Sequence, residues 1–336
     1  MGLTGSKSPA NPWRKRRSNL TKMEKMTTKV FIDGKAGTTG LRIYDRLQLR
    51  NDIELMTLSE EDRKNPDCRR KMLNSCDIAF LCLPDDASRE AVAMIENPDV
   101  VVLDTSTAHR TLDDWAYGFP ELSPEFFRKV ANSKRIAVPG CHASGFIALV
   151  KPLIDAGILS AGTLLTCHSL TGFSGGGKKM IAEYEDPARP QLFDAPRQYG
   201  LTQQHKHLKE MVKITGCADA PVFSPIVADY YSGMLVTVPL FKAQLTGNAS
   251  VEDIRKVYRE LYNSKMVYYA ENATEGGLLS GNGMSGKDSM QIMVEGNEDR
   301  ILLLARYDNL GKGASGAAVE CMNIVMKLAP ETGLDL

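Results

Sequence analysis

A thiol, an imidazole and a hydroxyl fall within four residues in the segment VPGCHASGF, which spans residues 138–146. Cys141 follows Pro139 and Gly140 at a point where an apolar, strand-like run gives way to a pattern of helical spacing. A thiol at a helix N-terminus has its pKa lowered by the helix dipole and by free backbone N–H groups. The sequence therefore predicts a nucleophilic thiolate at Cys141, and the alternative is a small apolar side chain buried at a turn.

The other six cysteines lack this setting. Among the seven there is neither a C-x-x-C pair nor the His/Cys spacing of a zinc site, so we expect no metal centre. Their scatter and odd number are typical of a reducing compartment, which predicts a cytoplasmic protein. The interpretation as buried, inert side chains is kept for Cys76, Cys82, Cys167 and Cys321.

A thiolate nucleophile generally works with a positioned acid/base, and the chain has five histidines. His205 and His207 stand two apart in QQHKHLKEM, so they share a face on a strand or loop and diverge by about 200° on a helix. We expect at least one of them to face the thiol. The other three have structural interpretations: His142 as a helix-start residue, His168 as a strand residue and His109 as a loop residue.

The elements that would position these groups begin near residue 29. Strand-like apolar runs occupy residues 29–34, 53–58, 77–84, 99–106 and 135–140. A glycine-rich turn and a helical pattern separate the first two runs, which makes a βαβ unit, and the later runs are almost continuously apolar, as in parallel sheets covered on both faces. The pattern predicts a doubly wound, Rossmann-type dinucleotide-binding domain over residues 29–142.

Three glycines, Gly34, Gly37 and Gly40, form G-x-x-G-x-x-G directly after the first strand and at the start of the helix. Glycines there permit a tight turn and let backbone N–H groups approach a pyrophosphate. Ala36 stands where the usual motif has its second glycine, so the turn departs from G-x-G-x-x-G. We expect Thr38 and the three glycines to contact a dinucleotide, the alternative being a glycine-rich turn without a ligand.

The end of the second strand bears on which dinucleotide is bound. An acidic residue there favours NAD, whereas a 2′-phosphate requires hydroxyls and cations. Ser59 comes first, with Arg63 and Lys64 close behind, which favours NADP. Glu60 and Glu61 keep NAD open as the alternative.

The pattern changes after Cys141. A helix is expected over residues 144–159 and another over 251–265, and strand-like runs occupy 162–170, 222–230, 233–241, 289–296 and 300–307. Strands that follow one another without intervening helices predict a mostly antiparallel sheet, hence a second, α+β domain over residues 143–309. Residues 310–336 are expected to form a C-terminal helix that returns to the first domain.

The amino-acid composition limits which kinds of binding partner the protein can be expected to have. Lysine plus arginine and aspartate plus glutamate both number 41 in 336 residues, which gives no reason to expect a nucleic-acid partner. No apolar run approaches the roughly 20 residues of a membrane-spanning helix. Residues 1–28 are basic and polar and lack the apolar core of a signal peptide, so we expect a disordered leader there, with a transit peptide as the minor alternative.

Six blocks occur in order over nearly the whole chain: GKAGTTG, DTSTAHR, VPGCHASGFIALVKPL, SGGGKK, YGLTQQHKH and DNLGKGASGAA. Together they resemble the N-acetyl-γ-glutamyl-phosphate reductases in their shorter, second type. The resemblance implies NADPH-dependent reduction of N-acetyl-γ-glutamyl phosphate to N-acetylglutamate semialdehyde and phosphate, in arginine biosynthesis. It also implies the two-domain architecture of glyceraldehyde-3-phosphate and aspartate-semialdehyde dehydrogenases, and a cytoplasmic homodimer or homotetramer. Ser144 stands where longer relatives usually have threonine, and the basic leader has no counterpart.

Residue roles follow from this resemblance. It implies that Cys141 forms a thioester, that His205 or else His207 protonates the reacting oxygen, and that Arg110 contacts the substrate. Lys178 and Lys179 are candidates for neutralising phosphate or are simply solvated, and Asn309 and Gly311 belong to a segment closing over the nicotinamide. Two alternatives stay open: another semialdehyde dehydrogenase, such as one acting on aspartyl phosphate, and a non-catalytic NADP-binding regulator.

Overall fold

The computed structural model describes residues 27–336, so the leader predicted over residues 1–28 falls outside the described residues except for its last two. β1 (Thr28–Asp33) begins one residue ahead of the expected strand. It leads through the glycine-rich turn into α1 (Thr38–Leu47) and then β2 (Ile53–Met56), so the predicted βαβ unit is confirmed.

The first sheet has the strand order β2-β1-β3-β4-β6-β5, and every neighbouring pair is parallel. Its further strands are β3 (Ile78–Leu81), β4 (Val101–Asp104), β5 (Ala116–Tyr117) and β6 (Arg135–Ala137). β5 was not predicted, because a strand of only two residues leaves no detectable pattern. The helices of this half are α2 (Pro66–Ser75), α3 (Asp85–Ala93) and α4 (Pro124–Asn132).

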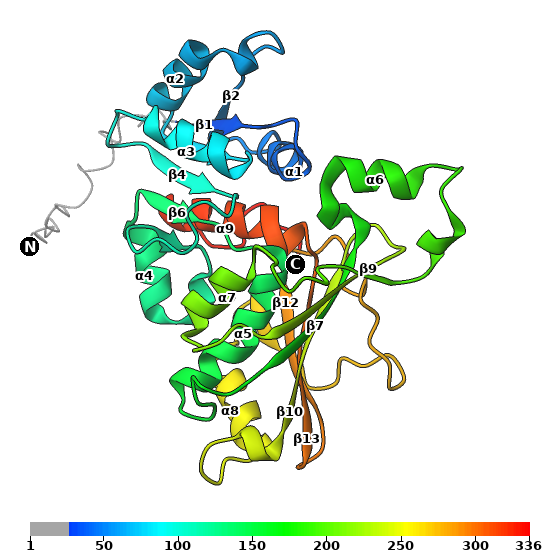
Figure 1. Ribbon diagram of the computed structural model, residues 1–336. Helices are drawn as coiled ribbons and strands as arrows, with labels where there is room; N and C mark the ends of the chain where they lie inside the picture. The colour runs from blue at the N-terminus through cyan, green and yellow to red at the C-terminus, as the bar shows by residue number, and fades with distance from the viewer. Residues whose placement is uncertain (1–26) are drawn as a thin grey trace, which may run out of the picture.

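Helices cover both faces of this sheet, as the continuously apolar strands require. On one face, side chains of α1, α4 and α9 (Gly316–Val325) pack in a common cluster with alternate residues of the strands. On the other face, α2 and α3 contribute Leu73 and Ala91 to a second cluster. Figure 1 shows α9, near the end of the chain, lying beside β6 of the first sheet. The doubly wound Rossmann-type fold is confirmed.

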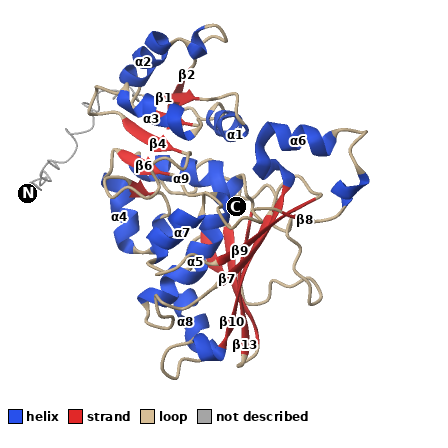
Figure 2. Cartoon of the chain, in the orientation of Figure 1, coloured by secondary structure: helices blue, strands red, loops and turns tan. Residues whose placement is uncertain are grey.

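The second sheet has the order β11-β12-β13-β10-β7-β9-β8. Its strands are β7 (Thr166–Gly172), β8 (Arg197–Gln198), β9 (Val222–Ala228), β10 (Met234–Phe241), β11 (Val267–Tyr269), β12 (Met290–Gly296) and β13 (Arg300–Tyr307). The pairs β11/β12 and β7/β9 are parallel and the other four are antiparallel, so the sheet is mixed but mostly antiparallel. Figure 2 shows these strands as a long twisted layer below the first sheet.

One face of the second sheet carries helices. α5 (Cys141–Asp155) and α8 (Val251–Leu261) supply side chains to the cluster that also contains the inward residues of β10 and β13. α7 (Leu208–Thr215) contributes the buried Met211 to the same cluster, whereas α6 (Gly177–Glu185) projects away on its own arm. This apolar packing fixes α5, and with it the position of Cys141 at its first turn.

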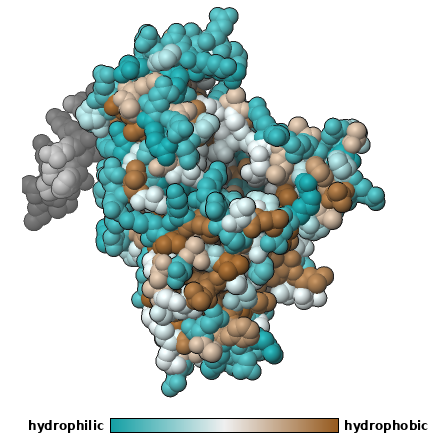
Figure 3. Space-filling model, viewed as in Figure 1, coloured by the Kyte–Doolittle hydropathy of each residue, from teal (hydrophilic) through white to brown (hydrophobic). Residues whose placement is uncertain are grey.

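Short helical turns complete the described chain. They are η2 (Asp62–Lys64), η3 (Pro120–Leu122), η4 (Phe173–Gly176), η5 (Gln191–Asp194), η6 (Lys242–Gln244) and the π-helical turn η7 (Gly311–Ser315). In Figure 3 hydrophilic residues cover α2 at the top, and hydrophobic patches gather on the lower half. Within residues 27–336, none of the helices has the length and apolar character needed to span a bilayer.

Candidate active site

Cys141 is the first residue of α5, three residues earlier than the predicted helix start. Gly140 is the N-cap in an extended conformation, and the Ser144 hydroxyl donates to the Gly140 carbonyl at 3.0 Å, which closes the first turn. The Tyr307 hydroxyl donates to the Cys141 carbonyl. The thiol is therefore fixed where the first sheet ends and the main helix of the second sheet begins.

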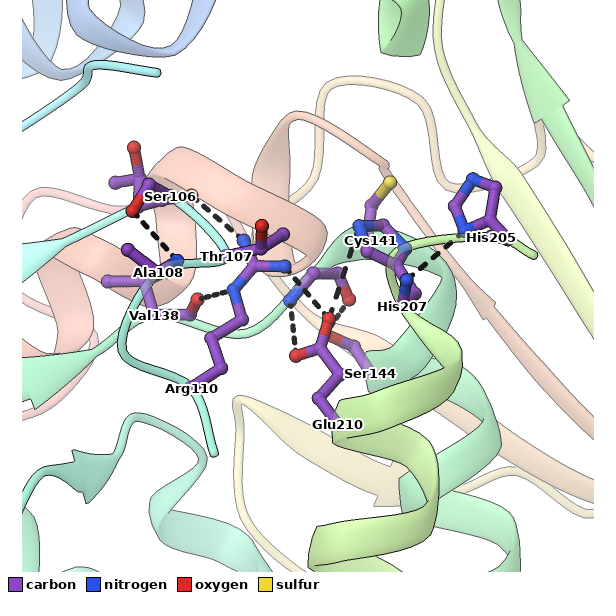
Figure 4. A network of polar contacts seen from close by, with 12 residues as sticks. Ser106, Thr107, Ala108, Arg110, Val138, Cys141, Ser144, His205, His207 and Glu210 are labelled. Atoms are coloured by element: carbon purple, nitrogen blue, oxygen red, sulfur yellow. Dashed lines mark hydrogen bonds and ion pairs between the residues drawn. The ribbon is translucent and has the colours of Figure 1, made fainter. Parts of the chain in front are cut away.

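Glu210 holds the turn in front of the thiol (Figure 4). Its carboxylate is 2% exposed, and Oε1 accepts a hydrogen bond from the Arg110 guanidinium at 2.8 Å. Oε2 accepts from the Tyr117 hydroxyl at 3.1 Å and from the Gly140 backbone N–H at 3.2 Å. A Cβ on Gly140 would lie 2.4 Å from Glu210 Oε1 and 2.4 Å from Arg110 Nη1, so only glycine fits here.

His205 and His207 both lie in the cavity wall beside Cys141. His205 is in the loop before α7 and His207 is the N-cap of that helix, with their ring centroids 4.8 Å apart. Burial lowers the pKa of His205, and the charge of Lys206 lowers it further. Burial, with Arg110 in support, also holds the pKa of His207 well below its usual value. Both imidazoles are therefore neutral at neutral pH.

The tautomer of His205 follows from one hydrogen bond. The backbone N–H of His207 donates to Nδ1 of His205 at 3.3 Å, so Nδ1 is the acceptor and the neutral ring carries its proton on Nε2. In Figure 4 the ring nitrogen of His205 that does not face His207 points toward the top of the view, as the Cys141 sulfur does. His205 is thus arranged to donate a hydrogen bond to an oxygen bound next to the thiol.

His142 and the other two histidines occupy different places. The ring nitrogens of His142 lie 2.6 Å from the hydroxyls of Ser169 and Tyr199, and burial lowers its pKa to about 3. His109 is buried against Asp104, and His168 lies on the outward side of β7. In residues 27–336 no group of three or more His, Cys, Asp or Glu side chains could hold a metal ion.

The predicted lowering of the Cys141 pKa is wrong for the free protein. Burial raises the pKa of the thiol to about 11, and the nearby charge of Glu210 adds to this effect. Arg110, the backbone N–H of His142 and Lys206 act in the opposite direction without cancelling it. The sequence indicated that Cys141 lies at a helix terminus. It did not indicate that the Glu210 carboxylate lies close by or that burial excludes water from the thiol. The resting group is consequently a protonated thiol.

A cavity of about 270 Å³ opens at the thiol between the two sheets. The predicted residues Cys141, His205, His207, Arg110 and Asn309 all line it. They are joined by side chains that the sequence analysis did not single out as site residues, notably Thr39, Tyr199 and Lys206.

Lys178, Lys179 and Gly311 lie outside this cavity, whereas the Asn309 amide lies in its wall but is hydrogen-bonded within the protein. Lys178 and Lys179 are exposed on α6 and do not line the cavity, and Lys179 faces Glu183 at 3.9 Å with its side chain 90% exposed. Asn309 donates to the Ser174 hydroxyl at 3.0 Å and accepts from the Gly233 N–H at 2.9 Å, so its amide fixes the chain rather than facing a ligand. Gly311 is buried in η7, outside the cavity wall.

A second, larger cavity of about 530 Å³ lies at the glycine-rich turn. Gly34 lines it with φ +86°, and a Cβ there would lie 2.3 Å from the Cys82 carbonyl oxygen, so the turn requires glycine. Gly37, Thr38 and Gly40 do not line this cavity; they form the cap and first turn of α1 behind it. Thr39, in the same turn of α1, lines the Cys141 cavity, and Leu41 of the same helix lines the larger one, so α1 contributes to both walls.

The far end of this cavity carries the residues predicted to select the cofactor. Arg63 and Lys64 line it, and so does Glu60, which accepts from Arg63 at 2.9 Å. Ser59 does not line it, and its hydroxyl donates to Asp62 at 2.8 Å. Arg69, paired with Asp33 at 2.9 Å, adds a further cation that the sequence analysis did not identify.

Glu210 is the most consequential residue that sequence reasoning missed. The signal that could have found it is its position three residues after His207, which puts both side chains on one face of the same helix start. Lys206 lies between the two histidines in the sequence, and the motif predicted no role for it.

Comparison with known families agrees with this geometry. Residues 29–130 match the family described as "Semialdehyde dehydrogenase, NAD binding domain", and residues 141–309 match "Semialdehyde dehydrogenase, dimerisation domain". The two matches follow the division between the sheets, and the second begins at Cys141.

Curated relatives are similar over nearly their whole length. N-acetyl-gamma-glutamyl-phosphate reductase 2 of Nostoc sp. is 45% identical over 318 residues, covering 91% of this chain and 99% of the relative. The N-acetyl-gamma-glutamyl-phosphate reductase of Sinorhizobium medicae is 45% identical over 309 residues, covering 90% and 99%.

Solved structures show the same fold at much lower identity. Aspartate semialdehyde dehydrogenase II of Vibrio cholerae superposes with a TM-score of 0.69 at 18% identity, covering 90% of this chain and 99% of that one. A probable aspartate-semialdehyde dehydrogenase of Pseudomonas aeruginosa gives a TM-score of 0.66 at 17% identity, again covering 90% and 99%. The predicted two-part architecture is confirmed.

Proposed function

Because this chain belongs to the N-acetyl-γ-glutamyl-phosphate reductase family of semialdehyde dehydrogenases, we propose that it reduces N-acetyl-γ-glutamyl phosphate to N-acetylglutamate semialdehyde and phosphate with NADPH. The observation that carries the proposal is the placement of Cys141, at the first turn of a buried helix, in one cavity with His205. Residues 29–142, 143–309 and 310–336 serve as the nucleotide-binding part, the catalytic part and the returning C-terminal helix.

The residues at the glycine-rich turn fit a dinucleotide. Gly34 leaves no room for a side chain, α1 presents its N-terminus to the turn, and the adjoining cavity of about 530 Å³ is lined by Arg63 and Lys64. Four cations line this cavity, Lys35, Arg63, Lys64 and Arg69, against two carboxylates, Asp33 and Glu60, and this excess of positive charge supports the phosphorylated cofactor NADP. When bound, NADPH supplies the hydride for the reduction.

The first step belongs to Cys141. Its sulfur attacks the acyl carbon, a C–S bond forms and the C–O bond to phosphate breaks, which gives a thioester and frees phosphate. The thiol proton leaves with the phosphate as HPO₄²⁻, so no charge is left on the protein. The backbone N–H groups at the start of α5 and the Nε2–H of His205 stabilise the negative charge that develops on the acyl oxygen.

The second step regenerates the thiol. After reduction, the thiohemiacetal on Cys141 carries its charge on oxygen, where the Nε2–H of His205 can again donate. The C–S bond breaks, the aldehyde leaves and the sulfur recovers a proton from water. His207 is a positioning residue in this scheme, since its backbone N–H fixes the tautomer of His205.

The reverse reaction tests the proposal. Purified protein is assayed for reduction of NADP with N-acetylglutamate semialdehyde, with and without phosphate, and in parallel with aspartate semialdehyde. Phosphate-dependent turnover of the acetylated substrate supports the proposal. Preference for aspartate semialdehyde would keep the chemistry and replace the substrate, whereas a protein that binds NADP but oxidises no aldehyde would be the regulator.

Replacing Arg63 with alanine should weaken NADP binding about tenfold and leave NAD binding nearly unchanged, because only NADP carries the 2′-phosphate that this cation would meet. Dissociation constants for both cofactors, measured by calorimetry, check this. Arg70→Ala is the control, since Arg70 is half-exposed on α2 outside the cavity. Equal weakening of NAD and NADP in Arg63→Ala would remove the support for NADP.

A cytoplasmic homo-oligomer completes the proposal. All seven cysteines are free, as a reducing compartment requires. The face of the second sheet opposite its helices presents apolar side chains in register, Leu170 opposite Leu235 and Pro239 opposite Leu302, of which Leu302 is the most exposed. A second copy on this face would bury them.

The variant Leu302→Asp should dissociate the oligomer, because Leu302 is 40% exposed on the face proposed for contact and an unpaired carboxylate would be buried there. Sedimentation velocity measures the outcome. Phe127→Asp is the matched control, since Phe127 is 44% exposed but lies on α4, against the first sheet. A monomeric wild type, or a variant Leu302→Asp that stays associated, would rule out this face.

A further inference from the structure

The Cys141 cavity must accommodate a phosphoryl dianion if the proposed reaction is right, and its wall contains only two lysine or arginine side chains among the described residues, Arg110 and Lys206. The neighbouring imidazoles are neutral, since burial lowers their pKa values. A bound phosphoryl group would be met by whichever of these two cations is not already paired within the protein.

Arg110 is committed to the protein. Its Nε donates to the Val138 carbonyl, one terminal nitrogen to Glu210 and the other to the Thr105 carbonyl, each at 2.8 Å. The residue is 7% exposed and the Glu210 carboxylate compensates its charge. Arg110 therefore holds the strand ends and the Cys141 turn together, which leaves little net positive charge for a substrate.

Lys206 is in the opposite situation. It lines the cavity between the two histidines and is solvent-exposed, and among residues 27–336 it has no hydrogen-bond or ion-pair partner. Its charge nevertheless contributes to lowering the pKa of Asp85 and opposes the rise in the pKa of the Cys141 thiol. Asp85 is already engaged by the Thr107 N–H at 2.9 Å and by the Thr107 hydroxyl.

We propose that Lys206 binds the phosphoryl group that Cys141 displaces, and inorganic phosphate in the reverse direction. This assignment rests on the proposed function and adds a phosphate-binding residue to it. A flexible ammonium group suits the role because it can move with a leaving group, whereas the Arg110 guanidinium is held in place by three hydrogen bonds. In the step itself the C–S bond forms and the C–O bond breaks, and the charge of HPO₄²⁻ is met by Lys206 as it departs.

The test is the reverse reaction with Lys206→Gln. We expect the KM for phosphate to rise about tenfold, with the KM for the semialdehyde changed less than about twofold, because a charge contact to one substrate is lost. Lys206→Arg keeps the charge and should restore most of the phosphate affinity. Lys178→Gln is the matched control, as it removes a lysine that lies outside the cavity on α6.

A second readout does not depend on turnover. Inorganic phosphate should slow alkylation of Cys141 by iodoacetate in the wild type, and this protection should be lost in Lys206→Gln and kept in Lys178→Gln. If the wild type lacks phosphate-dependent activity, the proposed function fails while this protection still decides the assignment of Lys206. An unchanged KM for phosphate with protection intact in Lys206→Gln, or an effect confined to Lys178→Gln, would overturn it.

Discussion

Replacing Cys141 with serine should lower kcat by at least about 10³-fold while leaving NADP affinity unchanged within about twofold. The serine hydroxyl is a much weaker nucleophile than the cysteine thiol, and an alkoxide is a poorer leaving group than a thiolate when the last intermediate collapses. Cofactor binding survives because Cys141 is not part of the cavity at the glycine-rich turn. Steady-state rates of the phosphate-dependent reaction and calorimetric titration with NADP measure the two quantities.

The matched control is Cys68→Ser. Cys68 is a half-buried thiol on α2 that lines neither cavity, so its loss should leave both the rate and the affinity unchanged. Residual activity above about a tenth of wild type in Cys141→Ser would mean that the sulfur takes no covalent part, since loss of a nucleophile costs orders of magnitude.

The second large effect is expected for Glu210→Gln, which should lower the free energy of unfolding by about 3 kcal/mol, because it leaves the buried Arg110 charge unpaired. The glutamine amide also fits badly, because its NH2 group must point at either the Gly140 N–H or the Arg110 guanidinium, and both of these are hydrogen-bond donors. Urea unfolding of variant and wild type measures the loss.

Glu210→Gln also has an electrostatic signature. The carboxylate raises the pKa of Cys141 and Arg110 lowers it, so removing the carboxylate alone should bring the thiol pKa down from about 11. Alkylation of Cys141 by neutral iodoacetamide should then become faster near neutral pH, even though the protein is less stable. The control Glu260→Gln, on the exposed side of α8, should change neither property. Unchanged stability and unchanged alkylation in Glu210→Gln would contradict the role given to the Glu210 network.

Much of the fold could be predicted from the sequence because it depends on local patterns. The glycine-rich turn lies between two runs of apolar residues, and no other residue can replace Gly34 so close to the Cys82 carbonyl. The continuously apolar strands required helices on both faces, and β1, β3 and β4 have them. The position of Cys141 at a strand-to-helix junction followed from the same reasoning.

What could not be predicted depends on contacts between distant segments. Glu210 and Arg110 are 100 residues apart, and their pairing decides both the stability of the Gly140 turn and the charge felt by the thiol. The helix dipole alone indicated a lowered thiol pKa, whereas the fold adds burial and a carboxylate that outweigh it. The lysines after the glycines of SGGGKK looked suited to phosphate, yet α6 turns them outward.

The different roles of Arg110 and Lys206 could not be predicted for the same reason, since they also depend on contacts between distant segments. The family resemblance implied Arg110 for the substrate, and a guanidinium suits a bidentate grip on phosphate or carboxylate. The structure gives three of its nitrogens to protein acceptors and leaves Lys206 without such a partner among the described residues. A residue's type therefore indicates what it can bind, and its neighbours determine whether it is free to do so.

The measurement that tests the account most directly is a single-turnover experiment without phosphate. Wild-type protein is mixed with NADP and N-acetylglutamate semialdehyde, the NADPH formed is recorded, and the quenched protein is digested for mass spectrometry. The account predicts a burst of NADPH equal to the active sites, followed by a halt, with the N-acetylglutamyl group on the peptide that contains Cys141. Sustained turnover without phosphate, or an acyl group on any other residue, would contradict the thioester on Cys141.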